Sequence, residues 1–182
     1  METYKKYIDS ALDMGFSHAV SINNYRLECE SKIRAYCNPQ QCTNYGTTWV
    51  CPPGCGTVKE CQEKAEDYRF GILLQTIDGI HKIGKWSWLQ RLQVKHNKRF
   101  LALADLARSE GLDVLPLTTG GCIVCRPCAF PNEPCREPER RMHSLSAYGI
   151  NVGKLCEKAG LEYSFREDKV YFTAYLGIRS ES

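Results

Sequence analysis

The chain has 182 residues, the length of one ordinary domain, and residues 1–182 are expected to form a single unit. Its 24 basic and 21 acidic side chains leave a net charge of +3, which is too small to suggest nucleic acid as a partner. No apolar run approaches the roughly 18 residues of a membrane span. The N-terminal segment mixes charged and apolar residues, unlike a secretory signal, so we expect a cytoplasmic protein.

Four segments are predicted to form helices, two of them from apolar residues at helical spacing. Near the N-terminus, Tyr4, Ile8 and Leu12 fall on one helical face. Further along, Thr57 and Glu60 have the spacing of a capping box, which marks the start of a helix. The predicted helices are 2–14, 57–68, 88–110 and 144–159.

Short apolar runs between these helices predict strands, of which the last two would form a β-hairpin around a polar turn at 166–169. Pro116 favours a strand edge or end, because proline cannot donate a ladder hydrogen bond. The sum is an α+β domain with a roughly five-stranded sheet, helices and two cysteine-rich loops that bind clusters. The predicted strands are 16–22, 70–76, 112–118, 161–165 and 170–178.

The chain contains eleven cysteines, an odd number that excludes complete internal disulfide pairing. In a cytoplasmic protein the thiols stay reduced, and reduced cysteines at short spacings usually bind metal. Most of them fall in two loops rich in proline and glycine.

The second loop, 120–138, carries the stronger pattern. Cys122, Cys125, Cys128 and Cys135 are spaced C-x2-C-x2-C-x6-C. The first three match the start of a ferredoxin run, although the gap to the fourth is longer than in ferredoxins. Structural zinc more often uses two separated pairs, so the spacing favours a [4Fe–4S] cluster and leaves zinc as the alternative.

The first loop offers five thiols for four places. Cys37, Cys42 and Cys51 lie in irregular chain, where ligands can converge. Cys61 falls in the first turn of the helix that begins after Thr57, where the helix dipole favours a thiolate. Cys55 lies in a glycine-flanked turn and ranks slightly behind Cys61 as the fourth ligand.

Ligation by only three of these thiols would leave one iron open to coordinate a substrate. The sequence therefore supports three functions: electron transfer by two fully ligated clusters, an enzyme with desulfurising or dehydrating chemistry at an open iron, or a zinc-stabilised binding module.

The segments CNPQQCTNYGTTWVCPPGCGTVKEC, YRFGILLQT and GGCIVCRPCAFPNEPCREPE resemble a family of cysteine-rich predicted metal-binding proteins of anaerobic prokaryotes. The resemblance extends over about residues 30–150. It implies metal or iron–sulfur binding by two sets of four cysteines, without implying a reaction. These are Cys37, Cys42, Cys51 and Cys61, and Cys122, Cys125, Cys128 and Cys135.

Other residues carry weaker expectations. Cys156 is expected to be a core thiol, and His96 to lie on a solvated helix face. His143 is a candidate proton shuttle near the second loop. Four arginines around that loop would offset cluster charge or dock an acidic redox partner protein. They are Arg126, Arg136, Arg140 and Arg141.

Overall fold

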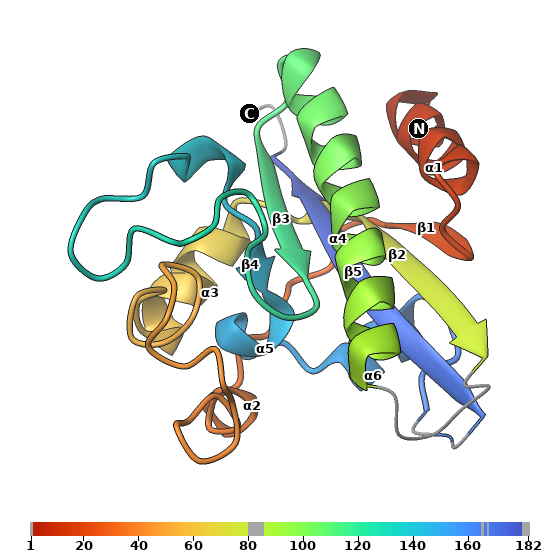
Figure 1. The fold of residues 1–182 in the computed structure, drawn as a ribbon. Helices are drawn as coiled ribbons and strands as arrows, with labels where there is room; N and C mark the ends of the chain where they lie inside the picture. The colour runs from red at the N-terminus through yellow and green to blue at the C-terminus, as the bar shows by residue number, and fades with distance from the viewer. Residues whose placement is uncertain (1, 80–85, 165, 167, 180–182) are drawn as a thin grey trace.

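The computed structural model describes residues 2–79, 86–164, 166 and 168–179 of the chain. These residues form one α+β unit around a five-stranded mixed sheet, which confirms the predicted fold class (Figure 1).

The sheet has the strand order β1-β2-β5-β3-β4. Its central strands are antiparallel, and only the short β4 runs parallel to its neighbour β3. The longest ladder joins β2 to β5 over ten residue pairs, among them Leu73 with Tyr175. The strands are β1 (His18–Ile22), β2 (Phe70–Gly79), β3 (Val114–Thr118), β4 (His143–Ser144) and β5 (Lys169–Ile178).

Helices cover both faces of the sheet, so that alternate residues of one strand enter two different cores. Ile72 and Leu74 of β2 pack against α1 (Glu2–Asp13) and α4 (Trp86–Ser109). Leu73 packs on the opposite face, with α3 (Val58–Glu66), α5 (Leu145–Tyr148) and α6 (Val152–Lys158). Burial on both faces explains why β2 reads as a continuous apolar run.

The predicted capping box at the start of α3 is confirmed. The Thr57 hydroxyl accepts from the Glu60 amide, and the Glu60 carboxylate accepts from the Thr57 amide. This pair fixes where the first cysteine loop ends and α3 begins.

The single helix predicted over 144–159 is wrong, because Gly149 divides it into α5 and α6. Gly149 has a φ of 80°, and a Cβ at this position would lie 2.7 Å from the Glu30 carbonyl oxygen. The chain needs glycine there so that Cys29 can form a β-bridge with Ile150.

The predicted C-terminal hairpin is also wrong. Residues 161–164 have no strand conformation, and β5 pairs instead with β2 and β3 at the centre of the sheet. Pro116 lies in β3 where β5 runs along one side, while the β4 pairing on the other side begins only at Leu117. The proline therefore occupies a locally unpaired strand side, in line with its predicted preference.

Both cysteine-rich loops lie beyond the β4 edge of the sheet, where they come together (Figure 1). The first, 35–57, connects the short helix α2 (Ser31–Arg34) to α3. The second, 119–137, follows β3 and leads through a 3-10 turn (Pro138–Arg140) to β4. None of the helices within the described ranges combines the length and the apolar character that a bilayer crossing requires.

Candidate metal centre

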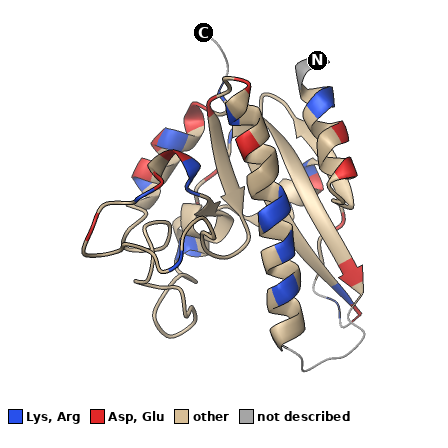
Figure 2. Ribbon diagram, turned by 45° about the horizontal axis from the view of Figure 1, so that its top comes forward, with Lys and Arg blue, Asp and Glu red and all other residues tan. Residues whose placement is uncertain are grey.

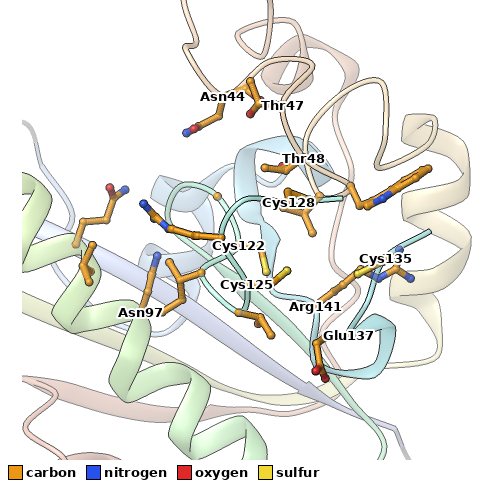
Figure 3. A pocket seen from close by; sticks show the side chains of 18 of the residues that line it. Asn44, Thr47, Thr48, Asn97, Cys122, Cys125, Cys128, Cys135, Glu137 and Arg141 are labelled. Carbon is orange, nitrogen blue, oxygen red and sulfur yellow. The ribbon is translucent and has the colours of Figure 1, made fainter. Parts of the chain in front are cut away.

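The four cysteines of the second loop surround one cavity of about 610 Å³. Cys122, Cys125, Cys128 and Cys135 are all half-buried and all line it. The four cysteines that the C-x2-C-x2-C-x6-C spacing predicts as ligands thus border the same space (Figure 3).

Two other parts of the chain complete this cavity. The first loop contributes residues 43, 44 and 47–50, and helix α4 contributes Gln90, Gln93, Val94 and Asn97. Arg141 and Glu137 border the cysteine side, as Figure 3 shows. No sequence signal pointed to the α4 residues, because they lie far from the cysteines along the chain.

In the first loop, the thiol of Cys55 lies among those of the predicted ligands. Burial raises the pKa of Cys37, and the neighbouring thiols of Cys42, Cys51 and Cys55 raise it further. The pKa of Cys51 is likewise raised by burial and by Cys42 and Cys55, while the hydroxyl of Thr48 beside it acts in the opposite direction. Four thiols are therefore close enough to feel one another's charge.

Cys61 lies next to this group and makes its closest thiol contact with Cys55. A hydrogen bond between the two thiols lowers the pKa of Cys61 and raises that of Cys55. Cys61 is 2% exposed and packs in the core around α3. Cys55 therefore lies with the other thiols of the loop, whereas Cys61 lies next to Cys55 in the core.

Arg34, at the end of α2, supplies a positive charge to this site. Its Nη2 donates to Cys55 Sγ over 2.8 Å, and its Nη1 lies 3.9 Å from Cys61 Sγ. Further hydrogen bonds to the carbonyls of Gly56 and Ala147 hold the guanidinium in place. Sequence reasoning missed Arg34, and its only signal was a basic residue three positions before Cys37.

The two loops contact each other directly. Trp49 of the first loop donates from Nε1 to the Glu133 carbonyl of the second over 3.0 Å. Its ring meets Phe130 edge to face at 5.0 Å between centroids. The same Phe130 ring packs on Gly54, where a Cβ would lie 2.9 Å away. Residues far apart in sequence thus form one joined cysteine-rich unit.

The donor set of this unit fits a thiolate-bound metal or cluster. Within the described part of the chain, no three Cys, His, Asp or Glu side chains stand in a geometry that would hold a single ion. Thiolates are, however, the ligands that both iron–sulfur clusters and structural zinc prefer, and each loop supplies four.

Two histidines were singled out from the sequence, and the structure places both in the interior. His96, expected on a solvated face, is fully buried, and its Nδ1 lies 2.8 Å from Thr76 Oγ1. His143 is 6% exposed and lines a smaller cavity of about 250 Å³ together with Cys55 and Cys61. Burial lowers the pKa of His143 to about 3, with Lys64 and Arg141 acting in the same direction.

The arginines around the second loop are largely engaged within the protein. Arg140 pairs with Asp105 of α4 at 2.6 Å, and Arg136 donates to the Pro127 carbonyl. Arg141 donates to the Pro138 carbonyl and borders both cavities. Cys156, predicted to be a core thiol, is fully buried as expected.

The cysteine-rich unit has the donor chemistry of a metal-binding protein. Residues 20–178 match a protein family described as "Predicted metal-binding protein (DUF2284)", and the chain belongs to that family. Comparison with curated proteins gave no match, and neither did comparison with solved structures.

Proposed function

We propose that the chain binds two [4Fe–4S] clusters, one in each cysteine loop, and transfers electrons through them. The proposal is supported by four cysteines in each loop, which line one cavity in the second loop and influence one another's pKa in the first. In the second loop these are the predicted ligands, Cys122, Cys125, Cys128 and Cys135. In the first loop we propose Cys37, Cys42, Cys51 and Cys55 in place of the set with Cys61. Bound clusters would supply one-electron redox chemistry at negative or moderate potentials.

Full ligation of the first cluster is what separates a carrier from the open-iron enzyme. Cys55 lies beside Cys37 and Cys51, so a fourth thiolate is at hand without any rearrangement of α3. Arg34 donates to Cys55 Sγ, and its positive charge partly offsets the hydrogen bond with Cys61 and the burial that raise the pKa of Cys55. We therefore favour electron transfer over substrate chemistry at the first cluster.

A basic face on α4 supports an acidic redox partner. Arg91, Lys95 and Lys98 are exposed and recur at the spacing of one helical face, and basic residues follow the same helix in Figure 2. They lie next to the α4 residues that line the cavity of the second loop. A negatively charged partner would be steered to this face. Reduced thiols also require a reducing compartment, such as the cytoplasm.

Metal and sulfide analysis of protein prepared without oxygen tests the proposal. We expect about eight iron and eight acid-labile sulfide per chain, and an electron paramagnetic resonance signal of reduced cubanes after dithionite treatment. Cys125→Ala should remove about half of the iron, whereas the control Cys156→Ala should keep all of it. Stoichiometric zinc with no iron, even after anaerobic reconstitution, would instead support the zinc-stabilised module.

A further inference from the structure

The cavity at the second loop has an amide-lined side that the cysteines do not explain. Gln90, Gln93 and Asn97 line it from α4, together with Val94. Their spacing of three and four residues places them on one face of the helix. Figure 3 shows Asn97 directed from α4 toward the cavity, across from the labelled cysteines.

The amides differ in how they are used by the fold. Asn97 is 2% exposed, and its side chain is held by the Thr119 carbonyl at 3.0 Å and the Thr118 hydroxyl at 2.7 Å. Gln90 and Gln93, in contrast, make no side-chain hydrogen bond to other described residues. Gly120 leaves room for the Gln93 amide, since a Cβ there would lie 2.5 Å from Gln93 Nε2.

The rest of this side is polar but uncharged. Thr43, Asn44 and Thr47 line it from the first loop, while the three charged lining residues come from the second loop and the segment after it. These are Arg126, Glu137 and Arg141. The volume of about 610 Å³ falls within the range of small-molecule pockets. A cubane bound to the cysteines would occupy their side and leave the amide side open to a second molecule.

We propose that this cavity binds a small uncharged molecule with an adjacent N–H donor and C=O acceptor, the edge of a cyclic amide. A glutamine side chain pairs with such an edge through two parallel hydrogen bonds, as asparagine and glutamine do with base edges. The apolar side chains of Val94, Ile123 and Val124 line the same space and suit a flat ring. An anion would face the negative charge of bound thiolates, and the amide-bearing residues of α4 that line the cavity are themselves uncharged. The inference takes only the position of the cysteines from the proposed function.

Binding of uracil to the iron-loaded protein, followed by isothermal calorimetry, tests this site. Uracil carries the donor–acceptor edge, 1,3-dimethyluracil lacks its donors, and orotate adds a carboxylate to the same ring. We expect uracil to bind at least about fivefold more tightly than either analogue, because dimethyluracil has no donor for the glutamine carbonyl and orotate brings a carboxylate toward the thiolates. Gln93→Leu should reduce uracil binding to the level of dimethyluracil. Gln40→Leu, an exposed amide that does not line the cavity, should leave it unchanged.

Equal binding of uracil and dimethyluracil, absence of binding, tighter binding of orotate, or full binding by Gln93→Leu would each overturn the inference. Iron and sulfide content, measured in every sample, reports on the proposed function separately. If the protein carries zinc and still discriminates uracil from its analogues, the proposed clusters are wrong and the proposed pocket stands. If the protein carries eight iron and does not discriminate between the ligands, the clusters stand and the pocket is wrong.

Discussion

Replacement of Cys55 and of Cys61 by alanine, one at a time, tests the ligand assignment of the first loop. Cys55 lies beside Cys37 and Cys51, and Arg34 donates to its sulfur at 2.8 Å. Cys61 instead fills a core position behind Cys55. We therefore expect Cys55→Ala to lose the first cluster, and Cys61→Ala to keep it.

The sizes of the two effects follow from the structure. Loss of one cubane lowers the iron content from about eight to about four per chain. Cys61 is 2% exposed, so its replacement removes one buried sulfur, comparable to the loss of a buried methyl group. Such a change costs about 0.5–1.5 kcal/mol, or roughly 1–6 °C in the unfolding temperature of a domain of this length.

The assay combines iron and sulfide analysis, electron paramagnetic resonance and thermal unfolding on both variants. Cys156→Ala is the matched control, since its thiol is fully buried and lies in the core away from both loops. Loss of iron from Cys61→Ala with retention in Cys55→Ala would refute the reasoning and restore the ranking made from sequence. Retention of both clusters in both variants, with a spectrum that shifts on adding small thiols or hydroxy acids, would indicate an open iron and an enzyme.

Three further outcomes are expected. Arg34→Leu should lower the reduction potential of the first cluster by about 60 mV, a tenfold change for one electron, in a redox titration, while Lys32→Leu should not. Chelation of the metal should expose both loops to protease, and Trp49→Ala should make each loop more sensitive even with metal bound; equal cleavage of wild type and variant would contradict the contact between the loops. Burial lowers the pKa of His96 to about 3 from its usual 6.5, so the unfolded chain binds the extra proton and the free energy of unfolding should fall as the pH drops from 6.5 toward 3. His96→Gln should reduce that slope, in denaturant titrations, by up to about 1.4 kcal/mol per pH unit; an unchanged slope would refute it.

Local sequence signals predicted the elements whose ends are set locally. Thr57 and Glu60 fix the start of α3 through their own side chains, and no distant residue takes part in that cap. The same reasoning failed at Gly149, because the reason for a break there lies in the backbone of Glu30, on another part of the chain. Helical periodicity continues through the glycine and carries no sign of that contact.

Strand pairing is a second place where distant residues decide. The segment 161–165 and β5 follow each other with a polar turn between them, which is the usual pattern of a hairpin. β5 pairs instead with β2 and β3, and nearly all of its residues are buried. A strand buried on both faces and both edges gains more from the sheet centre than from a hairpin at the surface.

In the site, too, local spacing predicts some positions and distant residues decide the others. In the second loop, the C-x2-C-x2-C spacing holds three cysteines within seven residues, so spacing alone predicts that they face one cavity. In the first loop the gaps are long, and the choice between Cys55 and Cys61 depends on how the loop folds back onto Arg34 and α5. The α4 side of the cavity has no sequence signal at all, because α4 lies far from the cysteines along the chain and meets the second loop only in the folded core.

The contact between the loops implies that a change at one cysteine site can affect the other. Distance along the sequence suggests that loss of one site would leave the second intact, yet Trp49, Phe130 and Gly54 pack the loops together. Neither loop has an extensive apolar core of its own, so we expect each to be ordered by the metal it binds and by the other loop. Residues 47–50 of the first loop also line the cavity of the second. A change in ligation at Cys51 or Cys55 is therefore expected to reach the cavity through only a few residues of chain, which gives the first site a structural route to affect the second.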